Sequence, residues 1–112
     1  MKLKNRLTST TEFRRVRHTG KSYAHPLVLL IASPSNKEYA RLGVTASRAI
    51  GNAVKRNRAK RRMRAAFQEF EFAAGWDLIL VARPGLDEAP WSELVEAINN
   101  LLKKAGAIGY SR

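Results

Sequence analysis

Two uninterrupted apolar runs of strand length do most to limit how this chain can fold. Residues 27–32 contain no polar side chain and stop at the turn-forming residues 33–36. Residues 77–82 form a second run that is apolar after Asp77, and Pro84-Gly85 stops it. A strand that is apolar on both faces has to be covered on both faces. The two runs therefore predict an α+β fold, an α/β sandwich in which helices pack on a four-stranded sheet.

The segments around these runs predict the remaining elements. Ser9 with Glu12 forms a capping box for a short helix that ends near Gly20. Residues 23–24 fit a brief edge strand, and residues 41–45 fit an antiparallel hairpin partner of residues 27–32. Residues 90–106 have helical spacing between a Pro start and a Gly stop. We expect the order α-β-β-β-α-β-α in one domain, with Trp76 and Trp91 in the core.

A long helix is predicted after the turn at Gly51-Asn52, because residues 53–70 contain neither Gly nor Pro. One side of this helix is apolar and forms a core stripe of Ala59, Met63, Ala66, Phe67 and Phe70. The opposite side carries Asn57, Arg58, Arg61, Arg64 and Gln68. That polar side has to face either water or a partner.

The same helix holds seven cations in ten residues: Lys55, Arg56, Arg58, Lys60, Arg61, Arg62 and Arg64. Residues 1–64 carry 17 Lys and Arg against 2 acidic residues, whereas residues 65–112 carry 4 against 7, and the whole chain has a net charge of +12. Like charges one helical turn apart repel each other, and no acidic residue is interleaved to relieve the repulsion. A nucleic-acid partner is the favoured interpretation, ahead of anionic lipid or a merely solvated face. Arginine favours phosphate contact in particular.

The helix predicts recognition of backbone or shape rather than of base edges. A groove-reading DNA helix needs short polar side chains among its cations and usually a preceding helix, whereas a strand precedes this one. Folded RNA fits the pattern at least as well as DNA. Phe13, beside Arg14, Arg15 and Arg17, is expected either to anchor the first helix in the core or to stack a single-stranded base.

Several chemistries find little support in the sequence. Cysteine is absent, which removes disulfides and Cys-ligated metal sites. Metal-assisted cleavage needs clustered carboxylates, and the basic part of the chain contains too few acidic residues to form such a cluster. An acid/base pair of His18 and His25 would lack a third group to orient it. Asp77, Asp87 and Glu88 are expected as caps or solvated loop ends. No targeting or membrane-spanning segment is visible, so a soluble cytoplasmic protein with no membrane partner and no small-molecule substrate is expected.

Three segments together resemble the signature of the bacterial ribonuclease P protein subunit. They are Gly43-Val44-Thr45-Ala46-Ser47-Arg48, Gly51-Asn52-Ala53-Val54, and Arg56-Asn57-Arg58-x-Lys60-Arg61-x-x-Arg64. Supporting similarity covers Arg6-Leu7, Glu12-Phe13, Gly20-Lys21-Ser22 and residues 77–83, hence nearly the whole chain.

The resemblance implies a left-handed βαβ crossover, where patterning alone would favour a right-handed one. It also implies a role in removing the 5′ leader of precursor tRNA, as part of a ribonuclease P endoribonuclease. In that family the RNA partner is the catalyst, so no catalytic or metal-binding residue is expected on the protein. Mg²⁺ would be held by the RNA partner and the substrate. The implied partners are the catalytic RNA and precursor tRNA.

Site residues follow from the motifs that match. The RNR motif, its flanking cations and a basic position before it predict an RNA-binding set of Lys55, Arg56, Asn57, Arg58, Lys60, Arg61, Arg62, Arg64 and Arg48. A cleft for the leader is predicted from Phe13, which matches an aromatic of the family, and from Arg17 and Leu30, where relatives have further aromatics. Alternation along the strands places Val28, Leu30 and Thr45 on the same face of the sheet.

Two other functions remain as alternatives. One is a ribosomal-type or RNA-chaperone module, which would bind RNA without any role in cleavage. The other is a protein-only nuclease, which would cleave RNA without a partner.

Overall fold

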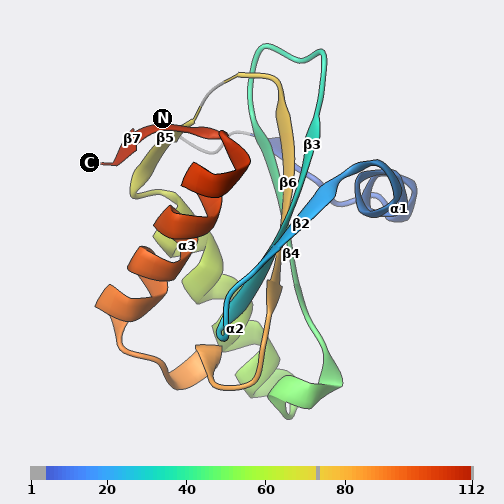
Figure 1. Cartoon of the computed structure of the whole chain (residues 1–112). Coiled ribbons are helices and arrows are strands. Elements are labelled where there is room, and N and C mark those ends of the chain that lie inside the picture. The colour runs from blue at the N-terminus through green and yellow to red at the C-terminus, as the bar shows by residue number, and fades with distance from the viewer. Residues whose placement is uncertain (1–4, 73, 112) are drawn as a thin grey trace.

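The computed structural model of the chain describes residues 5–72 and 74–111 (Figure 1). In chain order its helices and strands are β1 (Asn5–Arg6), α1 (Thr10–Thr19), β2 (Lys21–Ala24), β3 (Val28–Pro34), β4 (Arg41–Ala46), α2 (Ala53–Phe67), β5 (Phe70–Phe72), β6 (Trp76–Ala82), α3 (Trp91–Ala105) and β7 (Ile108–Ser111). Two short 3-10 helices, η1 (Arg48–Ile50) and η2 (Leu86–Glu88), precede α2 and α3 respectively. No helix in these residues is long and apolar enough to cross a membrane.

The main sheet has the strand order β1-β4-β6-β3-β2. Strands β2, β3 and β6 are antiparallel neighbours, whereas β6, β4 and β1 run parallel to one another. The predicted α+β class and its four principal strands are confirmed, with the two-residue β1 added at one edge. Strands β5 and β7, which the sequence did not predict, pair in a separate small sheet.

The predicted hairpin between β3 and β4 is wrong. Strand β6 lies between them and pairs with β3 on one side and β4 on the other. Both strands next to β6 cover its edges, and its residues 78–80 are fully buried. A strand this apolar is most stable in the middle of the sheet, so burial of the second apolar run outweighs the local preference for a hairpin.

Helices cover both faces of the main sheet (Figure 1). Helix α1 packs on β3 and β6 on one face, while α2 and α3 pack on the other face against β4 and β3. The larger core lies on the α2/α3 side and holds even-numbered strand residues, among them Val28, Leu30 and Leu80. The α1 side holds odd-numbered ones, including Ile31 and Ile79, packed around Val16. The alternation of side chains along each strand therefore assigns every strand residue to one of the two layers.

The crossover from β4 through α2 to β6 is left-handed, as the family resemblance implied. In Figure 1, β2 lies nearest the viewer, β4 lies behind β6, and α2 and α3 lie to the left of the sheet. Seen from the helices with the two parallel strands pointing up, β6 lies to the left of β4. The usual connection would place it to the right.

The helix starts are close to the predicted ones. The side chain of Ser9 accepts a hydrogen bond from the Glu12 amide at the start of α1, and Asn52 Oδ1 accepts one from the Lys55 amide at 3.0 Å at the start of α2. Helix α2 ends at Phe67, earlier than expected, and Phe70 is buried as the first residue of β5. Trp91, expected in the core, is 42% exposed at the start of α3.

Candidate nucleic-acid interface

Helix α2 presents a polar stripe on the side that faces away from the core. Its buried residues, Ala59, Met63, Ala66 and Phe67, all point toward the sheet and α3. Periodicity then places Asn57, Lys60, Arg61 and Arg64 outside, and we call these four residues the outer stripe. Together with Val54, which is 70% exposed, they line an open groove of about 480 Å³.

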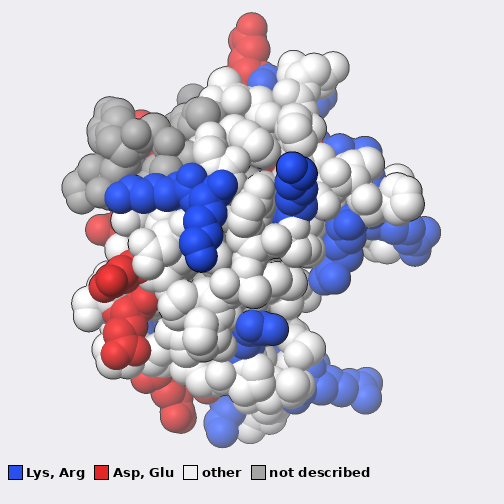
Figure 2. Space-filling view, viewed as in Figure 1, with Lys and Arg blue, Asp and Glu red and all other residues white. Residues whose placement is uncertain are grey.

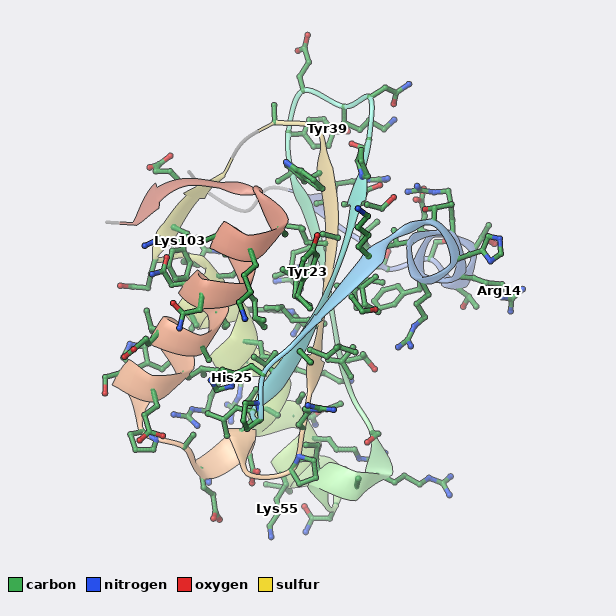
Figure 3. All side chains as sticks on the ribbon, viewed as in Figure 1. Arg14, Tyr23, His25, Tyr39, Lys55 and Lys103 are labelled. Carbon is green, nitrogen blue, oxygen red and sulfur yellow. The ribbon has the colours of Figure 1, made fainter. Side chains whose placement is uncertain are left out.

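The remaining predicted RNA-binding residues extend this surface in two directions. Lys55 and Arg58 are exposed at the first turns of α2, and Arg48 is exposed on η1. Figure 3 shows Lys55 projecting at the lower end of the molecule, while Arg14 projects from α1 on the right. In Figure 2, Lys and Arg cover the region of α1 and the lower end, whereas Asp and Glu gather on the left over α3.

The cations of α2 have no acidic partner among the residues that the structure describes. Within residues 5–72 and 74–111, every ion pair joins Arg15 or Arg41 to Glu12 or Asp77. The pKa of Arg64 lies below its ordinary value because burial disfavours its charge and because Arg6 on β1 is nearby. The Lys and Arg side chains of α2 therefore repel one another, and an external anion that binds them would reduce this repulsion. Arg6 was missed as a site residue because only the strand pairing brings it close to α2.

Arg62 differs from the outer stripe because it makes hydrogen bonds within the fold. Its guanidinium donates to the carbonyl oxygen of Leu86 at 2.5 Å and to that of Ala89, which ties α2 to η2. These two bonds use two of the five N–H donors of the guanidinium, and the predicted RNA-binding role of Arg62 stays a prediction. Arg56 is half-buried, and its Nε has no acceptor among the described residues. The position of Arg56 leaves its predicted role open to test.

The residues predicted to form a leader cleft do not share one face of the sheet, since two of them lie on the side away from α1. Val28 and Leu30 are both fully buried in the core on the α2/α3 side. Strand register instead aligns Leu29 with Val81 and Val81 with Thr45 across β3, β6 and β4. These three residues are half-buried on the α1 side, and we call them the sheet floor.

Helix α1 places Phe13 and Arg17 along the border of the sheet floor. Val16 is fully buried beneath the helix, so residues 13 and 17 lie on one flank and residues 12, 15 and 19 on the other. The Phe13 ring packs over Gly43, where a Cβ atom would collide with the ring. Phe13 is half-buried and Arg17 exposed. The ring of Phe13 therefore anchors α1 and also borders the sheet floor. This position is compatible with both of the roles considered for Phe13, a core anchor and a platform for base stacking.

An ion network around the buried Asp77 on the other flank joins α1 to the sheet. Asp77 is fully buried, contrary to the expectation of a solvated strand end. Its carboxylate accepts hydrogen bonds from Arg41 Nε at 2.8 Å and from the terminal nitrogens of Arg41 and Arg15 at 2.8 and 2.5 Å. Glu12 accepts from the same two arginines.

The network lowers the pKa of both carboxyls. Burial alone would raise the pKa of Asp77, but the hydrogen bonds from Arg41 and Arg15 outweigh it, so the value lies below the ordinary one. Hydrogen bonds from Arg15 and then Arg41 lower the pKa of Glu12. Arg15 and Arg41 are thus paired locally, whereas the described residues give the α2 cations no carboxylate within ion-pair distance.

The described residues offer no group of three or more His, Asp or Glu side chains that could hold a metal ion. The Nδ1 atom of His25 accepts a hydrogen bond from the Leu27 amide at 3.0 Å, which orients the ring within its turn. His18 is exposed on α1. These two side chains belong to different elements, and neither borders the outer stripe.

The chain is similar to known proteins over most of its length. The family model described as Ribonuclease P matches residues 1–106. The ribonuclease P protein component of Herpetosiphon aurantiacus is 36% identical over 107 residues, which cover 94% of this chain and 87% of that protein. The corresponding protein of Chloroflexus aurantiacus is 37% identical over 103 residues and covers 89% of this chain and 76% of that protein.

Solved structures agree with the fold. The RNase P protein from Thermotoga maritima matches with a TM-score of 0.78 and 26% identity, covering 90% of this chain and 97% of that one. The RNase P protein of Staphylococcus aureus matches with a TM-score of 0.77 and 26% identity, covering 89% and 94%.

Proposed function

Because this chain belongs to the family of bacterial ribonuclease P proteins, we propose that it binds the catalytic RNA of ribonuclease P and the 5′ leader of precursor tRNA. In this role it assists endonucleolytic removal of the leader during tRNA maturation. The chain contributes binding and positioning, and the RNA partner carries the catalytic groups. Mg²⁺ is held mainly by the RNA partner and the substrate.

The outer stripe of α2 is the observation that carries this proposal. Its Arg and Lys side chains lie in one row with Asn57 around an open groove, and they have no carboxylate partner in the described part of the chain. A phosphate backbone supplies closely spaced negative charge that fits such a row. Arginine adds bidentate contacts that fix the register of the backbone.

The sheet floor suits a single strand better than a duplex. Leu29, Val81 and Thr45 form a mostly apolar, half-buried row, and Phe13 stands at its border. Bases of an unpaired strand can stack on an aromatic ring and lie against apolar side chains. Arg17 on the same flank of α1 can contact the phosphates of that strand. We assign the 5′ leader to this row.

Reconstitution tests the proposal. The protein is added to catalytic RNA and precursor tRNA at low Mg²⁺, and the position and rate of 5′ cleavage are measured. We expect stimulated, correctly placed cleavage that Arg61→Ala with Arg64→Ala reduces. Lys103→Ala with Lys104→Ala, an equal charge change at the end of α3, serves as the matched control.

The alternatives predict different results in the same assay. An RNA chaperone would bind RNA without stimulating cleavage at the 5′ site. A protein-only nuclease would cleave precursor tRNA when the catalytic RNA is left out. Either result would contradict the proposal.

A further inference from the structure

Gly43 lies inside strand β4, where the backbone conformation does not require a glycine. Its φ is not positive, so an alanine could adopt the same backbone. A glycine in the interior of a strand is unfavourable because it has no side chain to pack, and it often marks a place where another group approaches closely. Gly43 is also buried. The reason for a glycine at this position is therefore the space beside it.

The ring of Phe13 fills the space that a side chain of residue 43 would need. A Cβ atom at this position would lie 2.8 Å from Phe13 Cε2, closer still to Phe13 Cζ, and 3.2 Å from Leu7 Cβ. The backbone of Leu7 is fixed, since its amide donates to the carbonyl oxygen of Leu42 at 3.0 Å. The ring is the end of a side chain, so the ring is the group that would move if residue 43 carried a Cβ atom.

The register of the sheet places this space next to the sheet floor. Gly43 lies opposite Ile79, and Ile79 lies opposite Ile31, in one row across β4, β6 and β3. Both isoleucines are buried in the cluster around Val16 on the α1 side, and they fill their part of the row. The next row, two residues along each strand and about 7 Å away, is the sheet floor. Gly43 thus leaves a gap in the covered row, and Phe13 fills the gap at the border with the floor.

We infer that Gly43 is a positioning residue for the 5′ leader, because the missing side chain lets the Phe13 ring lie low enough to continue the sheet floor as a stacking surface. This inference rests on the proposed function, which assigns the leader to the floor. A base that stacks on the ring and lies against the floor needs both surfaces at compatible heights. A side chain at residue 43 would lift the ring away from the sheet. Gly43 acts through Phe13.

The reconstituted holoenzyme tests this inference through its leader-dependent affinity, which is the dissociation constant for leaderless tRNA divided by that for precursor tRNA. We expect Gly43→Ala and Phe13→Leu each to lower this ratio about fivefold, as the loss of one stacked base would. Leucine lacks the Cε2 and Cζ atoms, so the collision is absent when Gly43→Ala is combined with Phe13→Leu. The double variant should therefore lose no more leader-dependent affinity than Phe13→Leu alone.

Val44→Ala is the matched control for a general loss of stability. Val44 follows Gly43 in the same strand, but its side chain lies in the core on the α2/α3 side. The substitution should lower the melting temperature and leave the leader-dependent affinity unchanged. A full ratio in Gly43→Ala, losses that multiply in the double variant, or an equal loss in Val44→Ala would overturn the inference.

Two further outcomes are also decisive. If thermal unfolding shows that Gly43→Ala alone does not fold, a folded double variant with the affinity of Phe13→Leu supports the inference. A double variant that is unfolded, or that loses more affinity than Phe13→Leu, overturns it. Should the unmodified chain bind leaderless and precursor tRNA equally, the proposed function itself is contradicted, and the inference with it.

Discussion

At the scale of single residues, the arginines differ in whether they are paired within the fold. Arg15 and Arg41 are occupied by Glu12 and Asp77, and Arg62 is occupied by backbone carbonyls of η2. Arg61 and Arg64 have no such partners in the described part of the chain. Composition alone treats all of these side chains as equivalent, whereas the hydrogen bonds separate arginines that are paired within the fold from arginines that are not.

Asp77 is predicted to be the residue on which the docking of α1 depends most. Replacing Asp77 by Asn leaves Arg41 and Arg15 without their buried counter-charge, and should lower the free energy of unfolding by about 3–5 kcal/mol. Urea unfolding at neutral pH measures the effect. Glu88→Gln, on the exposed side of η2, should change it little. Equal stability of Asp77→Asn and the unmodified chain would contradict a structural role for the network.

The same network predicts how stability depends on pH. Folding lowers the pKa of both Asp77 and Glu12, so the stability they contribute is present above their ordinary pKa values and is lost as pH falls through the folded-state values. The free energy of unfolding should therefore decrease below about pH 4. Urea titrations between about pH 3 and 6 test this, and Asp77→Asn should show a shallower decrease.

Leu29 and Leu30 are adjacent residues with opposite predicted roles. Leu30→Ala removes a fully buried side chain and should cost about 2–5 kcal/mol of stability. Leu29→Ala alters the half-buried sheet floor and should mainly weaken binding of precursor tRNA that carries a leader. The reconstituted holoenzyme is titrated with precursor tRNA and with leaderless tRNA to measure this difference. A leader-specific loss in Leu30→Ala alone would contradict our placement of the floor.

At the scale of elements, helix α2 has two functional sides that differ in what they contact. The outer stripe faces the groove, while Arg62 on another flank holds η2. Asn52 caps the helix start, and the buried stripe from Ala59 to Phe67 sets its rotation against the sheet. A change on one side of α2 should therefore affect RNA affinity, and a change on the other should affect stability.

Paired substitutions in α2 separate these two effects. Arg61→Ala with Arg64→Ala should weaken RNA binding and leave the melting temperature unchanged, because neither side chain anchors the fold. Arg62→Ala should lower stability by about 1.5–3 kcal/mol through the loss of its charge-assisted hydrogen bonds. Thermal unfolding and filter binding to the catalytic RNA measure both. A lower melting temperature in the double variant would indicate a structural role for the outer stripe.

At the scale of the whole molecule, the charge is divided between two sides. The first 64 residues carry a net charge of +15 and the remaining 48 carry −3. Figure 2 shows this division in space, with acidic residues over α3 and basic ones over α1 and the lower end. Such an arrangement orients the molecule in the field of a polyanion, with α3 facing away from it.

This arrangement predicts a strong dependence of RNA binding on salt. If about six cations contact phosphates, the logarithm of the association constant should fall against the logarithm of salt concentration with a slope of roughly −4 to −5. Arg61→Ala with Arg64→Ala should reduce the magnitude of the slope by about 2. Binding isotherms at several salt concentrations measure both values. A slope near zero would contradict the electrostatic account.

The sequence alone was sufficient for features that depend on short-range patterns. The two apolar strands, the caps at Ser9 and Asn52, and the core stripe of α2 as far as Phe67 lie where periodicity and capping chemistry predicted them. Each of these features depends on residues that are close together in the sequence, so the local sequence is enough to predict it. Asn57, Arg61 and Arg64 of the outer stripe followed from the same periodicity, whereas the groove lining added Lys60.

Only the tertiary structure decided the features that depend on distant segments. Alternation shows which strand residues share a face but not which face α1 covers, so Val28 and Leu30 were assigned to the wrong layer. The insertion of β6 between β3 and β4 brings Asp77 beside Arg41, and η2 occupies Arg62. Such pairings depend on which strands bury the most apolar surface together, a property of the assembled sheet that no single segment contains.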